Sequence, residues 1–539
     1  YVEKSGGCAM SDVPILKDTD RSTGRGALQK NIQAALALAG AVRSTLGPRG
    51  LDKLLIDDDG RTMVTNDGVT VLESAKVEHP VAKMIINASS VQDKIARDGT
   101  TSTVLISAEM LQNAWHLVTQ GVHPATIARG FRMAEEHARS ELNALSFASE
   151  RSHQLLATKT CLTGKGHESM QALLAQLALD AAEAVLVSTE RGPQADPTRV
   201  KILPQSGGTI GDSNLVTGLV LAKNRIHKDM PRHIKGGKIL LIDGGIERRS
   251  MMGSVKLNVT STGVLDAFRA KETELLEQQV THLKSLGVDL LACKEGIDED
   301  VRMMLTDAGI KAFRRVARSD LDLLARGCGA TLVHDVKRAS SADLGAFISS
   351  KNETWAGTVH WIVETEEGGA TFIARGSTEA VLGEVERSFA DALGVACQLV
   401  EDARLVAGGG ATQVALARRL RRYAESIPGR EQLGVEAFAD ALEVIPRVLA
   451  ENAGLDPIDT LLNLVAAQSN APSSSSDHIG LDVIHRKPEN MLTQGVIEPL
   501  LIIDQGITGA TEAAISVLRI DDVLWAKQDP VMADVPEME

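Results

Sequence analysis

The chain has 539 residues, a length that corresponds to about three domains of ordinary size. Hydrophobic residues make up 43% and charged residues 24% of the chain, which excludes a wholly disordered or collagen-like protein. The formal net charge of −14 argues against a nucleic-acid binder that works by bulk positive charge, although it is compatible with a local basic patch. Aromatic residues account for only 3%, so we expect an aliphatic core.

The N-terminal residues lack the apolar segment of a secretory signal, and no apolar run approaches the length of about 20 residues that spans a membrane. Residues 1–9 are therefore expected to be a leader or cloning remnant outside the fold, and the protein is expected to be cytoplasmic. The five cysteines are widely spaced and form no CxxC motif, which predicts reduced, buried thiols rather than disulfides or a zinc site. They are Cys8, Cys161, Cys293, Cys328 and Cys397.

Both ends of the chain carry apolar residues at helical spacing. The pattern predicts helices over residues 24–46, 80–96, 102–120 and 124–145 near the start, and over 434–452, 457–468 and 508–518 near the end.

The middle of the chain alternates between short apolar strands and helices, which is typical of an α/β unit. The expected strands are residues 238–243, 287–293, 310–314 and 330–333, and the expected helices are 299–307 and 320–326. Ser319 with Asp322 resembles a capping box. The order helical, α/β, helical indicates a middle domain inserted into a helical one.

The spacing of apolar and charged residues predicts a strongly charged amphipathic helix over residues 264–286, which ends at Gly287. The segment either packs on the α/β unit or projects from it as a lid or binding helix. Low complexity is confined to residues 473–476, a predicted surface loop, and no repeat of solenoid period is found.

The segment Arg97-Asp98-Gly99-Thr100-Thr101-Ser102 directly precedes an apolar helix. Free amides at a helix N-terminus bind phosphate, the hydroxyls add donors, and Asp98 could hold Mg²⁺. By itself, the same pattern is equally compatible with a helix N-cap.

Three further segments are ambiguous when taken one at a time. Residues 44–50 (STLGPRG) read as a helix C-cap or a ligand loop, and residues 406–411 (VAGGGA) as a flexible linker or a backbone that approaches a ribose or base. Residues 65–68 (TNDG) read as a tight hairpin turn whose Asp67 is structural.

Asp391 lies among apolar residues of a predicted helix, over residues 386–393, where it is either capped or functional. No Walker A motif, HExxH motif or Ser-His-Asp order is present, so a P-loop ATPase, a zinc protease and a serine hydrolase are not supported.

Together these segments resemble the chaperonin family of the group II type, which comprises the thermosome and the eukaryotic cytosolic chaperonin. The resemblance runs from about Ile15 to Ala526. It rests on STLGPRGLDKLL (44–55), TNDGVTVL (65–72), EHPVAKM (78–84), DGTTSTVL (98–105), ERSFADALGV (386–395), GGGA (408–411), EAFADALEVIPRVLAENAGLDPID (436–459) and ATEAAISVLRIDDV (510–523).

The resemblance implies a multidomain α and α/β chaperonin fold with three nested domains. Residues 1–149 and 401–539 would form a helical, ATP-binding equatorial domain, and 150–219 with 366–400 a small intermediate domain. Residues 220–365 would form an α/β apical domain that binds unfolded protein and carries a helical lid at about 255–285. The partners implied are client proteins and further copies in a stacked, homo-oligomeric double ring, with no separate co-chaperonin, nucleic acid or membrane.

The resemblance also implies roles for individual residues, with ATP and Mg²⁺ as the bound species. Asp98 would bind the metal, and Asp67 with Asp391 would orient and activate the attacking water. The nucleotide would be contacted by Leu46, Gly47, Pro48, Gly99, Thr100, Thr101, Ser102, Lys165, Gly409, Gly410 and Glu498. Asp98 and Asp391 would come from different domains, so domain closure would complete the site and couple hydrolysis to shape.

Three positions depart from the family pattern: Arg97 in place of a usual Gly, Ala407 in place of a usual Pro, and Leu501 in place of a basic or polar residue. They remove no catalytic group, but they leave nucleotide affinity and cooperativity open and indicate a divergent, prokaryotic branch.

The expected function is an ATP-hydrolysing folding chamber. The alternative is a ring scaffold that holds clients and turns over ATP negligibly; a small-molecule kinase would need an acceptor site that is not recognisable.

Overall fold

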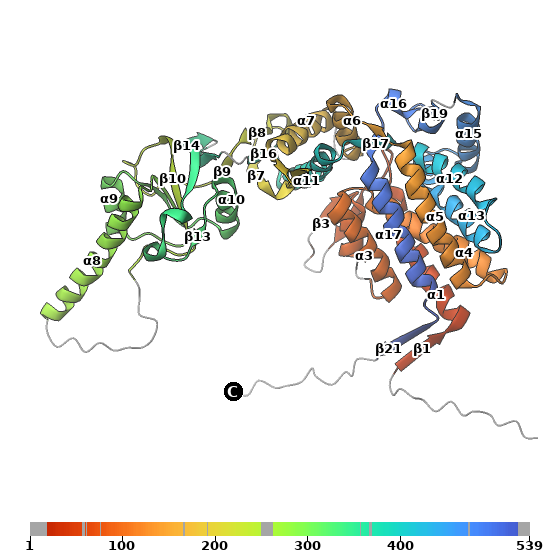
Figure 1. Ribbon diagram of the computed structural model, residues 1–539, viewed down its shortest axis with the longest axis horizontal. Helices are drawn as coiled ribbons and strands as arrows, with labels where there is room; N and C mark the ends of the chain where they lie inside the picture. The colour runs from red at the N-terminus through yellow and green to blue at the C-terminus, as the bar shows by residue number, and fades with distance from the viewer. Residues whose placement is uncertain are drawn as a thin grey trace, which may run out of the picture. The chain divides into compact units, whose positions relative to one another are not determined.

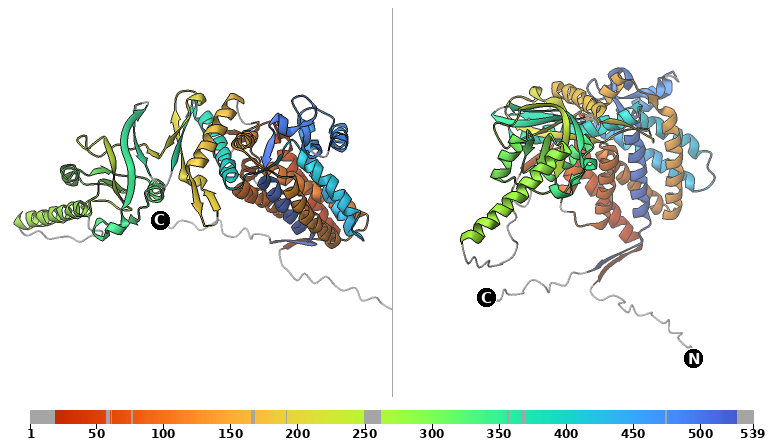
Figure 2. Two further views of the ribbon diagram at one scale, coloured as in Figure 1. Left: turned by 45° about the horizontal axis from the view of Figure 1, so that its top comes forward. Right: turned by 60° about the vertical axis from the view of Figure 1, so that its left-hand side comes forward.

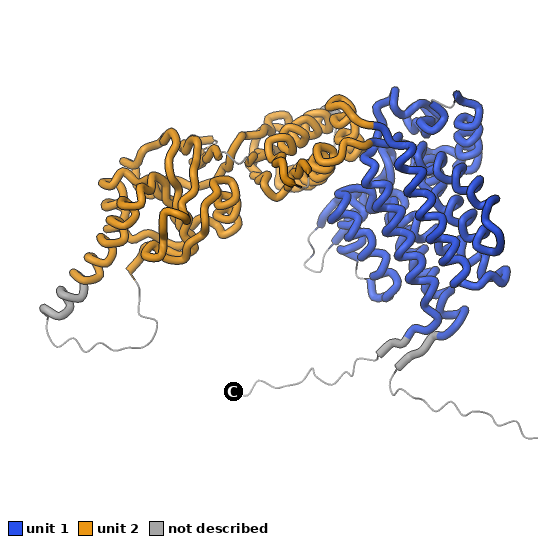
Figure 3. The backbone as a smooth tube through the Cα atoms, in the orientation of Figure 1, with its two compact units in different colours: residues 1–147, 405–539 blue, residues 148–404 orange. Residues whose placement is uncertain are grey.

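The computed structural model describes residues 19–56, 60, 62–75, 77–164, 168–190, 192–248, 262–355, 357–365, 369–472 and 475–526. The chain forms two compact units (Figure 3): residues 1–147 with 405–539, and residues 148–404. The first unit is thus built from both ends of the chain, and the second is inserted between them.

Unit 1 is a helical bundle whose long helices lie side by side (Figures 1 and 2). Its helices are α1 (Gly24–Val42), α2 (Gly68–Ser74), α3 (Pro80–Ala96), α4 (Thr100–Thr119), α5 (Pro124–Leu145), α12 (Ala411–Ala424), α13 (Glu431–Leu442), α14 (Val444–Asn452), α15 (Pro457–Asn470), α16 (Met491–Gln494) and α17 (Leu500–Leu518). One continuous core of buried, mostly aliphatic side chains joins all of them except α15 and α16, as the shortage of aromatic residues predicted. Phe131 and Phe438 are an exception and meet edge to face with their ring centroids 6.1 Å apart.

The predicted terminal helices are confirmed, but some of their limits differ. The segment 434–452 is two helices, α13 and α14, because Pro446 in the first turn of α14 has no N–H for a continuous ladder. Helix α17 begins at Leu500 rather than at 508. Its early polar residue Asp504 forms a two-pronged ion pair with Arg139 of α5, at 2.7 and 3.0 Å, so a tertiary contact accommodates a residue that breaks the apolar pattern.

Helix α17 is also long and apolar enough to cross a membrane, but 61% of its most apolar window is buried inside the protein. That burial is typical of the core helix of a bundle.

Small antiparallel sheets complete unit 1. The two ends of the described chain pair as β1 (Thr19–Thr23) and β21 (Asp522–Ala526), β2 (Lys53–Ile56) pairs with β3 (Thr62–Thr65), and β18 (Ile479–Asp482) pairs with β19 (Lys487–Asn490). Strand β17 (Arg404–Ala407) pairs with β20 (Ile497–Pro499).

Unit 2 contains a curved, seven-stranded mixed sheet of order β12-β11-β10-β14-β15-β9, with β13 also paired to β10. The strands are β9 (Leu219–Leu221), β10 (His233–Ile242), β11 (Leu290–Cys293), β12 (Lys311–Phe313), β13 (Leu332–Val333), β14 (Gly345–Trp355) and β15 (Thr358–Glu364). Helices α8 (Thr262–Leu286) and α9 (Glu299–Asp307) supply one apolar layer, and α10 (Arg318–Cys328) supplies the other. The predicted α/β alternation is confirmed.

A second part of unit 2 combines a three-stranded sheet, β7 (Val200–Ser206), β16 (Ala370–Gly376) and β8 (Asn214–Thr217), with three helices. These are α6 (Arg151–Cys161), α7 (Glu168–Ala184) and α11 (Glu379–Glu401). Phe372 of β16 stacks on Phe389 of α11 with ring centroids 3.6 Å apart, which ties the sheet to the helix. A short hairpin, β5 (Leu186–Thr189) and β6 (Gly192–Ala195), lies in the chain between α7 and β7.

Two local predictions for unit 2 have clear outcomes. The capping box at Ser319 is wrong, because α10 begins at Arg318 with Ala317 as its N-cap and has no side-chain cap. The predicted helix 264–286 is confirmed as α8, and its C-terminal half buries Leu276, Val280 and Leu283 against the sheet. Residues 255–261 of the expected lid lie outside the described residues.

The cysteine prediction is confirmed where it can be examined: Cys161, Cys293, Cys328 and Cys397 are free and buried. Burial raises the pKa of the Cys293 thiol strongly, so it stays protonated and unreactive. Cys8 lies outside the described residues.

Candidate nucleotide site

The N-terminus of α4 is open to a ligand. Gly99 is the N-cap residue in the left-handed conformation, with φ of 79°, and no side chain caps the helix. The first intrahelical bond runs from Thr103 N–H to Gly99 C=O at 3.0 Å, so the amides of residues 100–102 have no acceptor within the helix. A Cβ atom on Gly99 would lie 2.7 Å from Ile502 of α17, so only glycine fits here.

A buried glutamine that the sequence analysis did not single out holds the turn before α4. Gln92 of α3 is 1% exposed, and its Nε2 donates to the carbonyl of Asp98 at 2.8 Å and to that of Ile502 at 3.0 Å. The amide therefore joins α3, the turn and α17. Its signal in the sequence is a polar residue on the otherwise buried face of α3, which also carries Ile85 and Ala96.

The segment TNDG lies against this turn, but it is not the hairpin turn that the sequence predicts. Asp67 is the N-cap of α2, and its Oδ2 accepts bonds from Thr70 N at 3.0 Å and Thr70 Oγ1 at 2.6 Å. A Cβ atom on Gly68 would lie 2.4 Å from Thr101 Oγ1 and 3.3 Å from Thr100 Oγ1. The tertiary fold thus brings Asp67 next to the start of α4.

The carboxylate of Glu498 is close enough to Asp98 to be affected by its charge. Burial, together with the nearby charge of Asp98, raises the pKa of Glu498 to about 7. Glu498 lies in β20, paired with Val406 of β17, and its Oε1 is 3.0 Å from where a Cβ of Gly408 would be. The glycine triplet, Glu498 and Asp98 therefore share one region of unit 1.

Helix α14 positions two of the predicted contact loops. Asn452 donates to the carbonyl of Leu46 at 2.8 Å, and Leu449 packs against Gly47, where a Cβ would lie 2.3 Å from its Cδ2. Pro446 of the same helix packs on Gly410, where an added Cβ would lie 2.9 Å from the Cβ of the proline. Because both loops rest on α14, residues 46–48 and 409–410 lie near each other although they are far apart in the sequence.

Two predicted residues are not part of this group. Asp391 lies partly exposed on α11 of unit 2, while the remaining described candidates belong to unit 1. Lys165 lies outside the described residues.

The three departures from the family pattern differ in their structural meaning. Arg97 ends α3 in the left-handed conformation, with φ of 57°, where a side chain costs about 1–2 kcal/mol relative to glycine. Ala407 is the last residue of β17, and its carbonyl accepts a bond from Thr412 Oγ1 at 2.7 Å. Nothing in the structure explains Leu501, which lies in the first turn of α17.

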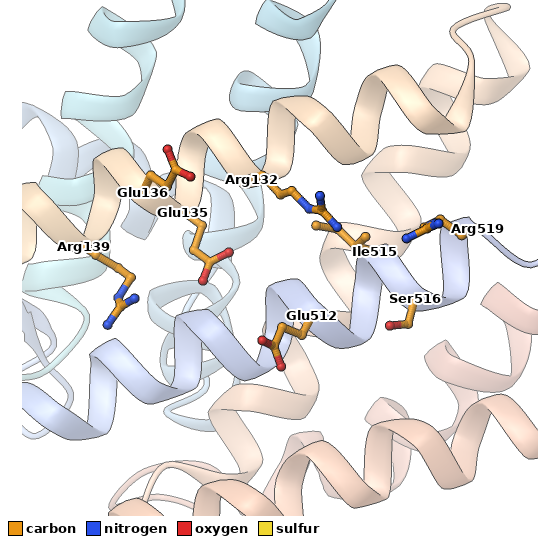
Figure 4. A pocket seen from close by; sticks show the side chains of 8 residues that line it. All are labelled: Arg132, Glu135, Glu136, Arg139, Glu512, Ile515, Ser516 and Arg519. Carbon is orange, nitrogen blue, oxygen red and sulfur yellow. The ribbon is translucent and has the colours of Figure 1, made fainter.

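A separate, open groove of about 760 Å³ lies between α5 and α17 (Figure 4). Six of its eight lining side chains are charged, and none is a predicted site residue. They are Arg132, Glu135, Glu136, Arg139, Glu512, Ile515, Ser516 and Arg519. Burial raises the pKa of Glu135, but the groove has neither the uncapped helix start nor the glycine-rich backbone of the region around α4.

Comparison with known proteins identifies the family. Residues 38–528 match the TCP-1/cpn60 chaperonin family. The chain is 40% identical over 524 residues to the thermosome subunit beta of Methanothermobacter thermautotrophicus, covering 96% of each chain. It is 40% identical over 528 residues to the thermosome subunit of Methanocaldococcus jannaschii, again covering 96% of each, and 39% identical over 520 residues to the thermosome subunit beta of Thermoplasma acidophilum, covering 95% of each.

These matches span both units and every motif on which the resemblance rested, and they agree with the observed combination of a helical unit and an α/β unit. The chain therefore belongs to the TCP-1/cpn60 chaperonin family.

Proposed function

We propose that the protein is an ATP-hydrolysing subunit of a ring-shaped folding chamber. The observation that carries this proposal is the uncapped start of α4 with Asp98, Glu498 and Gly408 gathered around it in unit 1. Amides that lack acceptors and backbone without side chains suit the phosphates and the sugar of a nucleotide.

The residues also fit Mg²⁺. Burial and then the negative charge of Asp98 raise the pKa of Glu498, and a bound cation would offset that unfavourable charge. Among the described residues, no group of three or more His, Cys, Asp or Glu side chains is arranged to hold a metal. Asp98 would therefore hold the ion together with nucleotide phosphates and water, the usual arrangement for Mg²⁺, and the ion would neutralise phosphate charge.

The protein's own groups divide the work of hydrolysis. The α4 amides and the hydroxyls of Thr100, Thr101 and Ser102 would orient the phosphates, and Gly409 and Gly410 would lie against the nucleoside. Asp67 has one oxygen engaged in capping. In the part of the chain that the structure describes, its Oδ1 receives no hydrogen bond, so that atom is available to a water. Asp391 would activate the same water, and its role requires α11 to reach the nucleotide when the subunit closes.

The wider proposal follows the family. Unit 1 would be the equatorial domain of a stacked, homo-oligomeric double ring in the cytoplasm. Unit 2 would comprise the intermediate domain (150–219 and 366–400) and the client-binding apical domain (220–365), with a built-in lid at about 255–285 in place of a separate co-chaperonin. The names of the relatives, thermosome subunits, support the assembly into a larger particle.

The test is the variant Asp391→Ala in the assembled protein. The control is Asp402→Ala, at the C-terminal end of the same helix, α11. ATP binding should stay near the wild-type value while hydrolysis falls about 10²–10⁴-fold. Electron micrographs should show rings for both variants. Hydrolysis at the wild-type rate in Asp391→Ala would contradict the catalytic role, and negligible hydrolysis by the wild type would favour the holding scaffold instead.

A further inference from the structure

A group of cations lies on the connection between β9 and β10, on the first residues of β10 and just after the edge strand β12 in unit 2, although the chain as a whole is acidic. Five come from the connection between β9 and β10 and its exit, and two follow β12. We call this group the basic rim; it consists of Lys223, Arg225, Lys228, Arg232, Lys235, Arg314 and Arg315. The only carboxylate within the connection is Asp229, which lies 3.6 Å from His227.

Backbone contacts hold the rim against β12. Ile226 N–H donates to the carbonyl of Ala312 at 3.1 Å, and Lys223 Nζ donates to the carbonyl of Arg315 at 2.5 Å. Ile226 and Met230 insert into the apolar layer beneath α8 and α9. The connection is therefore anchored by its apolar side chains, and Lys228 and Arg232 remain exposed.

The positive charges of the basic rim are not paired with carboxylates of the described part of the chain. Among the described residues, no ion pair joins any of its seven cations to a carboxylate, while cations elsewhere in the same unit, such as Lys201 with Asp320 at 2.5 Å, are paired. Arg225 instead donates to the carbonyls of His227 and Lys228. Such an arrangement concentrates positive potential at one place.

The neighbouring titratable groups respond to this potential. Burial and then the charge of Arg232 lower the pKa of Arg225, against the opposite effect of Asp229. Behind the rim, burial and the charge of Arg225 lower the pKa of Lys311 to about 7. An anion bound at the rim would reverse the electrostatic part of both effects.

We propose that the basic rim binds acidic segments of unfolded client polypeptides and so biases client selection toward acidic proteins. The inference rests on the proposed client-binding function of unit 2 and names the class of client. Arginine and lysine side chains without internal partners suit carboxylates spaced along an extended chain, and an overall net charge of −14 would repel the same segments from most other surfaces.

The experiment uses three labelled, unfolded peptides of equal length and apolar content, in which the charged positions are all Glu, all Lys or all Gln. Fluorescence anisotropy with the assembled protein at low salt measures their affinities. The Glu peptide should bind about tenfold more tightly than the Lys peptide, as expected for several exposed charge contacts, and the difference should shrink as salt is raised.

The double variant Lys228→Glu, Arg232→Glu should abolish this preference without changing ATP hydrolysis. The control is Lys337→Glu, Arg338→Glu, which changes the charge equally on exposed residues beyond β13. An equal loss in the control, equal binding of the Glu and Lys peptides, or tighter binding of a DNA oligonucleotide than of the Glu peptide would overturn the inference. Failure of wild-type protein to bind the Gln peptide would instead count against client binding itself.

Discussion

Lys311 provides the most quantitative prediction. Its side chain is fully buried in unit 2, where Nζ donates to the carbonyl of Arg232 at 3.0 Å and to the carbonyl and Oγ of Ser350, both at 3.2 Å. The ring of Phe313 lies 5.6 Å away. All three acceptors are neutral, so the ammonium group carries a desolvation cost without a compensating carboxylate.

The magnitude follows from the pKa, which falls from 10.5 to about 7 on folding. The unfolded chain keeps the proton up to 10.5 whereas the folded protein loses it near 7, so the folded state gains stability as pH rises between these values. At about 1.4 kcal/mol per pKa unit the full cost is about 5 kcal/mol, present below pH 7 and absent above 10.5.

We expect Lys311→Met to stabilise unit 2 at neutral pH and to flatten this dependence. Between pH 7.5 and 9.5 the advantage of the variant should shrink by about 2.5 kcal/mol. Urea unfolding followed by fluorescence measures it, in a background with Trp115→Phe and Trp525→Phe so that the tryptophans of unit 2 report. Lys235→Met, which removes an exposed lysine, should show no such trend. An advantage of Lys311→Met that is independent of pH would refute the reasoning.

Three predictions concern the nucleotide site. Gln92→Leu should weaken Mg·ATP binding about tenfold, because two hydrogen bonds that hold the turn at Asp98 are lost. Titration calorimetry measures the affinity, and the control Gln432→Leu on α13 should leave it unchanged. Asp98→Ala should weaken Mg·ATP more than metal-free ATP and lower the pKa of Glu498, and equal affinities in the two titrations would leave Asp98 as a purely structural residue. Glu498→Gln should stabilise unit 1 by about 2 kcal/mol above pH 7, because the wild-type carboxyl group ionises there in a folded environment that disfavours its charge. The stabilisation should vanish below pH 4.5, where the carboxyl group is protonated in both the folded and the unfolded state. Urea unfolding at several pH values measures it.

Much of the local structure was determined by the sequence alone. Periodic apolar residues predicted α3, α5 and α8, and short apolar runs predicted β10, β11, β12 and β13 of the large sheet, whereas β9, β14 and β15 were not predicted. The motif around Asp98 predicted a helix start, which the structure places at Thr100, but by itself it did not distinguish a phosphate site from an ordinary N-cap. Family membership followed from several such motifs in one order.

The tertiary structure decided what distant residues do to one another. Asp67 caps α2 rather than closing a hairpin, Asp504 continues a helix because Arg139 pairs with it, and Gln92 becomes a clamp only where α3 meets α17. The depressed pKa of Lys311 likewise depends on the chain that surrounds it. Apolar periodicity indicates which face of a helix or strand is buried. Hydrogen bonds and pKa shifts depend on which groups from remote segments contact that face, and a local sequence pattern does not specify those contacts.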